Sequence, residues 1–326
     1  MLIYECISGG ALGSIPASPG APAGLLAQGM AMRDALAGDL AQLDHLAVSC
    51  VAAPMAPLPA ALGRVRRVAP DVDGDPAEFL AHVARDYDRV WAIAPESDGL
   101  LAALAATVGQ PRWLGCTPSA IRLAASKTAT RARLAAGAIA VPRAWSPGEP
   151  EPRTNGHWIV KPDDGAGTAD TFRHANFAAA QADLLARLTR GVPSTLEAWV
   201  DGPPLSLSLL CCADQAELLS INRQRIIARP GEALAYRGVE ICAEPVDGAP
   251  GRLLAALARR IAVAVPGLAG YVGVDLVWHP EHGPVVIEIN PRLTCAYVGL
   301  SDALGRNLAG EILLALHLET ASHVLH

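Results

Sequence analysis

The sequence has little aromatic side-chain area, with three Phe and five Tyr among 326 residues. It also lacks a long apolar run. No window approaches about 18 uninterrupted apolar residues, so no membrane-spanning helix is expected. The first residues, MLIYECISGGAL, contain neither a basic segment nor a long apolar core, which argues against a signal peptide. These absences favour a cytoplasmic protein with no membrane partner.

Positive charge is not concentrated anywhere either. The formal net charge is −6 and no block rich in lysine and arginine occurs, which argues against nucleic acid as a main partner. The seven cysteines include no C-x-x-C pair, so reduced structural thiols are expected. What the chain does have is 51% hydrophobic residues, enough for a large core, and a length typical of two or three structural units.

Residues 1–115 alternate short apolar runs with helical patterns. Strands are predicted at LIYECI, HLAVSCV, VRRVA and RVWAIAP, with helices at LLAQGMAMRDALAGDLAQL, around PAEFLAHVARDY, and over 97–108. This order predicts a doubly wound parallel sheet.

The rest of the chain is richer in strands. A helical zone at 117–137 begins with Thr117-Pro118, a good N-cap and N1 pair, and a Pro- and Gly-rich loop follows at 146–156. Strands are predicted at HWIVKP, STLEAWV, PLSLSLLCC, ELLSINRQR, YRGVEICAE, GYVGVDLVWH and VVIEINPR, with helices at 251–263 and 306–317. The pattern predicts an α+β region with a largely antiparallel sheet.

Two lysines stand at element boundaries. Lys161 ends a predicted strand directly before Asp163-Asp164-Gly165-Ala166-Gly167, a turn whose backbone N–H groups could approach an anion closely. An ordinary hairpin explains the same residues. Lys127 opens a helix after Ser126, and taken singly it is as well explained as a surface lysine.

The strand with Glu197 breaks at Asp201-Gly202-Pro203-Pro204 and then resumes. Such a hinge offers backbone N–H and C=O groups to a purine edge without needing particular side chains. A plain β-hairpin is the competing interpretation.

Acidic and amide side chains interrupt two apolar strands near the C-terminus. Glu288 and Asn290 are two positions apart on one strand and so share a face. If a hairpin at 280–283 pairs this strand with that of Asp275, three oxygen ligands converge in a way that suits Mg²⁺. Arg292, just beyond, could fork onto a phosphate oxygen. A wet sheet edge is the alternative.

Taken in order, Ser126-Lys127, Lys161 with its glycine-rich turn, Glu197-Ala198-Trp199-Val200, Asp275 and Glu288-Ile289-Asn290-Pro291-Arg292 resemble the ATP-grasp superfamily of carboxylate–amine ligases. The resemblance covers about residues 115–300. It implies an α/β fold followed by α+β, divided into an N-terminal domain (1–115), a first ATP-grasp subdomain with a glycine-rich lid (116–190) and a C-terminal subdomain (191–326).

The resemblance also implies roles for individual residues. Lys127, Lys161, Gly165 and Gly167 would contact the ATP phosphates. The backbone of Glu197, Ala198, Trp199 and Val200 would contact adenine, with Ile287 against the ring. Asp275, Glu288 and Asn290 would bind Mg²⁺, with Mn²⁺ as a substitute, and Arg292 would hold the transferring phosphate. Many members place a ribose-binding acid near Pro204, which this chain lacks, and Asp201 is the candidate replacement.

A narrower resemblance rests on ECISGG, APESDGLL, SINRQRI and EINPRLTCAYVGLSDALGRNL. These segments look like the tyramine–L-glutamate ligases of methanofuran- and methylofuran-type cofactor biosynthesis. The implied substrates are small molecules, the glutamate γ-carboxyl and an aromatic amine such as tyramine. Arg223 is the expected catalytic contact to the amino acid, while Glu96 and Asp98 would bind the amine or close the domain interface.

Three functions remain open at the level of sequence. They are a tyramine–L-glutamate ligase, an ATP-grasp ligase for another amino acid or peptide, and a non-catalytic ATP-binding protein. Retention of both lysines, the acid–amide set and Arg292 favours an enzyme that forms a C–N bond through an acyl phosphate. No Ser-His-Asp or Cys-His arrangement stands out. A homodimer is the candidate assembly.

Overall fold

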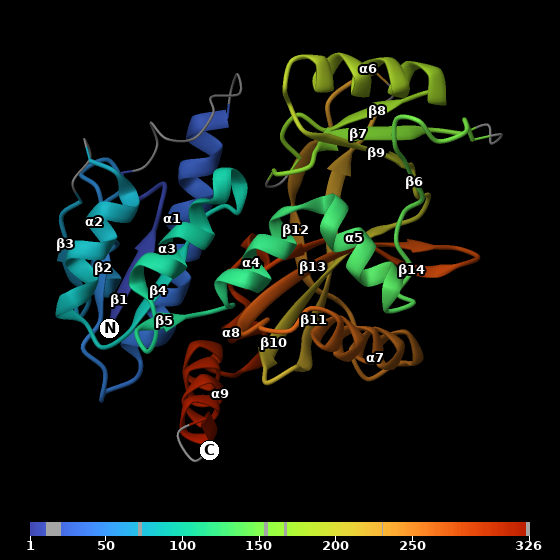
Figure 1. Cartoon of the computed structure of the whole chain (residues 1–326). Helices are drawn as coiled ribbons and strands as arrows, with labels where there is room; N and C mark the ends of the chain where they lie inside the picture. Colours follow the sequence, from blue (N-terminus) through green and yellow to red (C-terminus); the bar gives the residue numbers. More distant parts are fainter. Residues whose placement is uncertain (11–20, 71–73, 153–155, 166–167, 230, 324–326) are drawn as a thin grey trace.

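The computed structural model describes residues 1–10, 21–70, 74–152, 156–165, 168–229 and 231–323. Its strands form three sheets, one parallel and two antiparallel (Figure 1). Gly167 and Ala166, predicted to lie in the phosphate-binding turn, fall outside the described residues.

The N-terminal domain contains the parallel sheet, with strand order β3-β2-β1-β4-β5. Its elements are β1 (Leu2–Glu5), α1 (Ala21–Ala41), β2 (Ser49–Val51), β3 (Arg66–Val68), α2 (Pro76–Val83), β4 (Val90–Ile93), α3 (Leu100–Val108) and β5 (Trp113–Leu114). Short 3₁₀ turns lie at Ala60–Leu62, Ala84–Asp86 and Ser97–Gly99. The strand order reverses at β1, between β2 and β4, which confirms the doubly wound prediction.

The two faces of this sheet are covered by different helices because alternate residues of a strand point to opposite sides. Leu2 and Tyr4 of β1 join a core cluster with residues of α2 and α3. Ile3 joins a second cluster with α1 and with the C-terminal helix α9 (Leu308–His323). The last helix of the chain therefore completes the first sheet.

The larger antiparallel sheet has the order β12-β11-β10-β13-β14. Its strands are β10 (Pro204–Cys212), β11 (Gln215–Ile227), β12 (Ala235–Glu244), β13 (Gly270–His279) and β14 (Gly283–Asn290). Helix α7 (Ala249–Ala264) packs on one face through Leu254, Leu257 and Ile261. After β14 come a 3₁₀ turn at Cys295–Tyr297 and α8 (Leu300–Leu304).

The smaller antiparallel sheet has the order β6-β9-β7-β8. It consists of β6 (Ala144–Trp145), β7 (Trp158–Pro162), β8 (Phe172–His174) and β9 (Ser194–Ala198), covered by α6 (Phe177–Thr189). Because β9 belongs to this sheet, the expected subdomain boundary at residue 190 comes too early. By sheet membership the change falls after Ala198. The hairpin interpretation of Glu197 is excluded, because β9 and β10 lie in different sheets.

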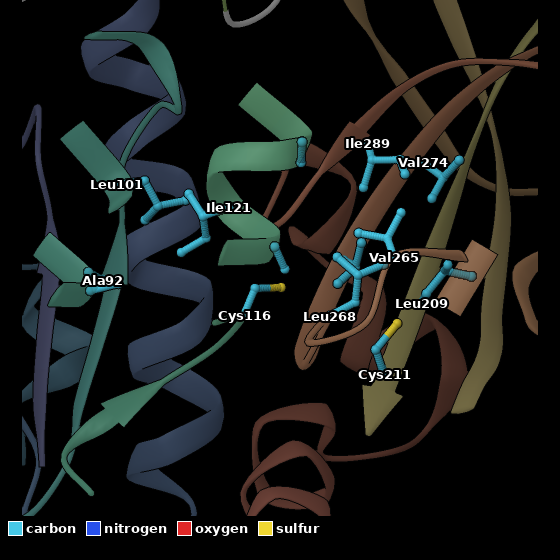
Figure 2. Packing of buried hydrophobic residues seen from close by; sticks show 14 of the residues in the cluster. Ala92, Leu101, Cys116, Ile121, Leu209, Cys211, Val265, Leu268, Val274 and Ile289 are labelled. Atoms are coloured by element: carbon cyan, nitrogen blue, oxygen red, sulfur yellow. The ribbon is translucent and has the colours of Figure 1, made fainter. Parts of the chain in front are cut away.

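Two further helices, α4 (Pro118–Ala125) and α5 (Lys127–Ala136), lie between the domains and contact β14. Figure 2 shows Leu101 of the N-terminal domain next to Ile121 of α4, and apolar side chains continue from there to Val274 and Ile289. One hydrophobic core thus runs from the parallel sheet to the larger antiparallel sheet. The side chains of the interface are fixed by packing on both sides.

Most predicted elements are confirmed to within a few residues, including Thr117 as the N-cap of α4 and the opening of a helix at Lys127, which Ser126 caps. Helix α6 was not predicted, although Asn176 caps it and its sequence is rich in alanine and leucine. Strands β5, β6 and β8 are too short to show a period. No helix in the described ranges is long and apolar enough to span a membrane.

Candidate active site

The site lies on the polar face of the larger sheet. Ser206 of β10 pairs with Asp275 on one side and Asn222 on the other, so these three side chains share a face. Leu205 and Leu276 point to the opposite face, where the core with α7 lies. The hydroxyl of Ser206 is buried without a hydrogen-bond partner in the described structure. The strands therefore deliver polar groups to one side only.

Strands β13 and β14 form the predicted hairpin and bring the acids together. Asp275 pairs directly with Glu288, and Gly273 pairs with Asn290. The next pair joins Leu276 to Val286, so Ile287 has no cross-strand partner and forms a β-bulge. Bulges turn side chains at functional sites, and this one lies directly before Glu288. The strand pairing thus confirms the geometric premise of the acid–amide set.

Asp275 is held by two amides. Gln224 Nε2 donates to Asp275 Oδ1 at 2.9 Å, and Asn290 Nδ2 donates to Oδ2 at 3.3 Å. Burial and the neighbouring charge of Glu288 raise the pKa of Asp275 to about 7. Two carboxylates so close in a buried place repel each other, which a divalent cation relieves.

The donor chemistry fits Mg²⁺. Carboxylate oxygens of Asp275 and Glu288 are hard ligands, and Asn290 can offer its amide oxygen because its nitrogen already faces Asp275. Among the described residues no group of three His, Cys, Asp or Glu side chains gathers at one point. A cation here would thus take two carboxylates and one amide, and phosphates and water would complete its shell.

Lys127 is the first residue of α5 and is buried. Its Nζ donates to the carbonyl oxygen of Gly165 at 2.6 Å and lies 3.8 Å from Glu288 Oε1. The glycine-rich turn is thereby connected to β14 through one ammonium group. This contact supports a position for Lys127 at the centre of the site.

Asp163 fixes the same turn to the start of α5. Its carboxylate accepts hydrogen bonds from Ser126 Oγ at 2.7 Å and from the backbone N–H of Thr128 at 2.8 Å. Burial acts to raise the pKa of Asp163, but the hydrogen bonds from Thr128 and Ser126 lower it below its ordinary value. Asp163 thus acts as a second cap of the helix that carries Lys127.

Lys161 forms a buried ion pair. Its Nζ lies 2.9 Å from Glu197 Oε2 on the adjacent strand β9, and Arg131 NH1 lies 3.3 Å from Glu197 Oε1. Arg131 comes from α5, one turn after Lys127. An ammonium group has three N–H donors, so pairing with Glu197 leaves capacity for a phosphate. The side chain of Glu197 therefore positions Lys161, a role that the sequence did not reveal.

In the segment predicted to contact adenine, two backbone N–H groups already form hydrogen bonds within the protein. The backbone N–H of Ala198 donates to Arg143 and that of Trp199 to His157, at 2.7 and 2.9 Å. These two N–H groups are therefore paired with backbone carbonyl oxygens of the protein itself. Asp201 Oδ1 accepts a hydrogen bond from Trp199 Nε1 at 3.0 Å, so its carboxylate is shared with the indole.

Gly202 makes the hinge between the two antiparallel sheets. Its φ is +140°, and a Cβ there would lie 2.1 Å from the carbonyl oxygen of Trp278. A glycine is required because the backbone of β13 passes directly beside it.

The side chain of Arg292 is already paired within the protein. It forms an ion pair with Glu96, with Nε 3.1 Å from Oε1 and NH2 3.1 Å from Oε2. Glu96 follows β4 at the point where the strand order of the parallel sheet reverses. Of the two roles predicted for Glu96, the structure supports the one at the domain interface.

Arg223 does not join this group, which corrects the sequence-based assignment. It pairs with Leu205 in the sheet and so lies on the face opposite Asp275. Its guanidinium is half exposed and forms an ion pair with Glu244. The alternate residues of the same strand, Asn222 and Gln224, face the site instead. Within the segment SINRQR, the amide side chains rather than Arg223 therefore lie on the face that carries Asp275.

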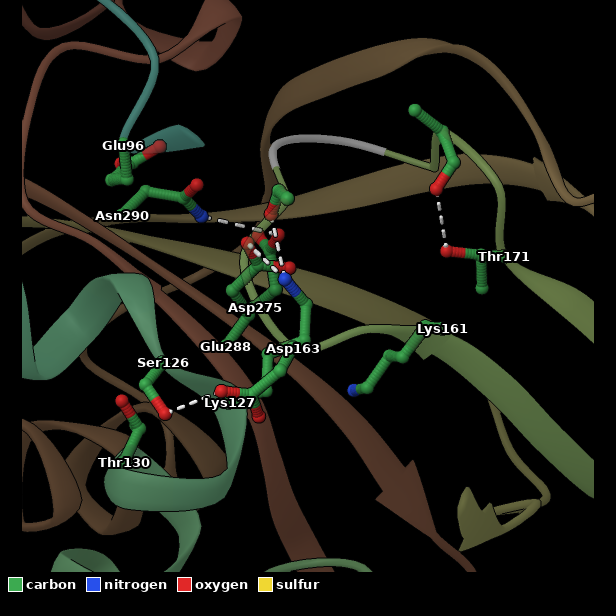
Figure 3. Close-up of polar contacts among 12 residues, drawn as sticks. Glu96, Ser126, Lys127, Thr130, Lys161, Asp163, Thr171, Asp275, Glu288 and Asn290 are labelled. Carbon is green, nitrogen blue, oxygen red and sulfur yellow. Dashed lines mark hydrogen bonds and ion pairs between the residues drawn. The ribbon is translucent and has the colours of Figure 1, made fainter. Parts of the chain in front are cut away.

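The structure brings most predicted residues together. Figure 3 shows Lys127, Lys161, Asp275, Glu288 and Asn290 converging from α5, β7, β13 and β14. Glu96 approaches from the N-terminal domain. Sequence reasoning missed Gln224 and Arg131. The second could have been found from its spacing of four residues after Lys127, which places both on one helix face.

Comparison with known proteins gives one consistent result. A sequence model described as an ATP-grasp domain matches residues 124–296, and a model described as a pre ATP-grasp 3 domain matches 46–121. No curated protein matches the chain.

Several solved structures share the fold at low sequence identity. One is described as an ATP-grasp superfamily protein from Archaeoglobus fulgidus (TM-score 0.68, 24% identity, covering 96% of this chain and 87% of that one). Another is an L-amino acid ligase from Bacillus licheniformis (TM-score 0.65, 20% identity, 88% and 72%). A third is D-alanine–D-alanine ligase from Bacillus anthracis complexed with ATP (TM-score 0.60, 16% identity, 98% of both chains).

The first sequence match spans more than half of the chain, and it begins and ends around the residues that build the site. The chain belongs to the ATP-grasp family.

Proposed function

We propose that this protein is an ATP-dependent ligase that activates a carboxylate as an acyl phosphate and joins it to an amine. The observation that carries the proposal is a pair of carboxylates and an amide with the buried Lys127 beside them and the buried Lys161 on the same side of the site (Figure 3), within a chain of the ATP-grasp family. Cations placed around oxygen ligands suit a polyphosphate bound together with a divalent metal.

In this proposal Lys127 and Lys161 bind the ATP phosphates, together with Gly165 and Gly167 of the turn. Asp275, Glu288 and Asn290 hold Mg²⁺. When bound, the metal neutralises phosphate charge and so favours attack by an anionic carboxylate. Adenine would lie against Ile287 and the hinge near Val200. Asp201 remains the candidate for the ribose.

The chain's own residues account for the rest of the chemistry. The attacking carboxylate oxygen forms a bond to the γ-phosphorus and the bond to ADP breaks, so two anions must be held together. Lys127, Lys161 and Arg292 offset that repulsion through charge placed in a buried site. The amine then attacks the acyl carbon, and inorganic phosphate leaves. Positioning and charge suffice, so no nucleophile–base pair is required.

For the substrates, we propose L-glutamate and an aromatic amine such as tyramine, from the likeness of the ECISGG, APESDGLL and EINPRLTCAYVGL segments to that branch of the family. Structural neighbours named as an L-amino acid ligase and a D-alanine–D-alanine ligase favour a second candidate, in which both substrates are amino acids. The correction at Arg223 removes one predicted glutamate contact and leaves the class of reaction unaffected.

ADP release with Mg·ATP, measured for glutamate with tyramine and for pairs of amino acids, tests the proposal. Mass spectrometry should find a product whose mass is the sum of acid and amine minus water. If the protein binds ATP and no acid–amine pair yields ADP or an amide, the protein is a non-catalytic ATP-binding protein and the ligase proposal is wrong.

A further inference from the structure

The Glu96–Arg292 pair connects residues 196 positions apart and both are enclosed by protein. The side chain of Glu96 is 4% exposed and that of Arg292 is 13% exposed. Glu96 comes from the N-terminal domain, whereas Arg292 lies two residues after Asn290 at the end of β14. The N-terminal domain therefore reaches the edge of the proposed metal site through one side chain.

The guanidinium of Arg292 is held along two edges. NH2 donates to Glu96 Oε2 at 3.1 Å and NH1 donates to the carbonyl oxygen of Leu293 at 3.1 Å, whereas Nε lies 3.1 Å from Glu96 Oε1 as a charge contact without hydrogen-bond geometry. The backbone N–H of Arg292 donates to the carbonyl oxygen of Asn290 at 2.9 Å. The two side-chain hydrogen bonds from different nitrogens fix the direction of the planar guanidinium as well as the position of its charge.

A second carboxylate acts on the same arginine. Burial acts to lower the pKa of Arg292, but the charges of Glu96 and then of Glu288 raise it above its ordinary value. Burial raises the pKa of Glu96. The positive charge of Arg292 acts to lower this pKa, and the negative charge of Glu288 raises it further. Arg292 is thus within electrostatic reach of Glu96, Glu288 and Asp275, although among the described residues its ion pair is with Glu96.

We infer that Glu96 is a positioning residue that holds Arg292 away from Glu288 and so keeps Glu288 available to a divalent metal ion. The inference rests on the proposed function, in which Glu288 is a metal ligand. A buried guanidinium without a partner is strongly unfavourable, so an Arg292 released by Glu96 would turn to a neighbouring carboxylate such as Glu288, four residues before it in the chain. Pairing with Glu288 would then compete directly with the cation.

Direct binding of Mn²⁺ in the presence of ADP, followed by electron paramagnetic resonance of the free ion, tests this without any turnover. Glu96→Gln should raise the Kd for Mn²⁺ by about tenfold or more, the usual effect of losing a residue that supports a metal ligand. Glu311→Gln is the matched control, because Glu311 also forms a hydrogen-bonded ion pair with an arginine, Arg306, away from the site. Its Kd should stay at the wild-type value.

The double variant Glu96→Gln/Arg292→Gln removes both the guanidinium that would compete with the cation and the carboxylate that positions it. Its Kd for Mn²⁺ should return to within about threefold of the wild type, while ADP release with substrates stays low because Arg292 is missing. A merely structural role for Glu96 would leave the double variant at least as weak as the single one. Thermal unfolding of each variant confirms that it is folded.

Arg292→Gln alone keeps the test valid if Glu96→Gln does not fold. Without the guanidinium, Arg292 cannot compete for Glu288, and the Lys127 contact to Glu288 is the same as in the wild type, so Mn²⁺ should bind at least as tightly as to the wild type. An unchanged Kd in Glu96→Gln, or weaker binding in Arg292→Gln, overturns the inference. Failure of the ligase proposal is seen separately, as Mn²⁺ and nucleotide binding without ADP release for any pair of substrates.

Discussion

Lys161 and Glu197 lie on neighbouring strands of the smaller sheet, with 2.9 Å between Nζ and Oε2, and both are almost fully buried. The pair holds the lysine in one direction before any nucleotide arrives. An ammonium that is already oriented loses less conformational entropy when a phosphate binds than a free lysine would.

We therefore predict that Lys161→Met raises the KM for ATP by about tenfold or lowers kcat to a similar degree, because a charge-assisted hydrogen bond to phosphate is lost. Steady-state ADP release at varied ATP measures it. Arg131→Met is the matched variant, since it removes the other cation from Glu197. Equal effects in both variants would mean that the loss reflects an unpaired Glu197 and would remove Lys161 from phosphate binding.

Glu288→Gln should abolish Mg²⁺-dependent turnover while the protein stays folded. The change preserves shape but removes one of the two carboxylates, and the metal supplies several kcal/mol of charge stabilisation in reactions of this kind. Turnover across a Mg²⁺ titration measures the effect. Glu281→Gln, an exposed change in the turn of the same hairpin, is the control and should behave as wild type. Wild-type turnover in Glu288→Gln would exclude Glu288 as a metal ligand.

Asp163→Ala should lower the free energy of unfolding by about 1–2 kcal/mol at pH 7, because α5 loses its second cap. The folded pKa of Asp163 lies below its ordinary value of 3.8, so its stabilising effect is full above that value. It is lost as the pH falls through the folded pKa. Urea unfolding should show a constant difference from wild type between about pH 7 and 5, and a smaller one below about pH 4.

The control for this change is Asp44→Ala. Asp44 is exposed and its ion pair with Arg64 lies in solvent, so a change within about 0.5 kcal/mol is expected. A difference between Asp163→Ala and wild type that persists unchanged to about pH 2 would show that the carboxylate charge is not what stabilises the turn.

Gly202→Ala should destabilise the protein by at least about 2 kcal/mol, since the added Cβ collides with backbone rather than with a side chain that can move. Denaturant unfolding measures it. At Gly156 a Cβ meets no atom within 4 Å, so Gly156→Ala should be nearly neutral. Similar stabilities for the two variants would contradict the close passage of β13 beside the hinge.

The sequence predicted what depends on local pattern. Strand β13 matches the predicted segment from Gly270 to His279, and helices begin after Thr117 and Ser126 as expected. Period-two alternation also predicted that Glu288 and Asn290 share a face. These features depend on residues close together in the chain, so a single sequence contains them.

What could not be predicted depends on long-range pairing. The sheet to which β9 belongs is decided by contacts with β6 and β7, and nothing near Glu197 specifies them. The error at Arg223 has the same origin, because alternation tells which residues share a face but not which face is buried against α7. The contact of Glu96 with Arg292 required the packing of two domains.

The C-terminal helix α9 covers one face of the first sheet with Ile312, Leu313 and Leu316, beside α1. During synthesis the strands of that sheet emerge from the ribosome roughly 10–60 s before α9, at about 5–20 residues per second. For that interval Ile3, Cys50 and Trp91 lack part of their cover. The nascent chain therefore exposes part of this apolar face, a surface of the kind that chaperones bind, until α9 has been synthesised.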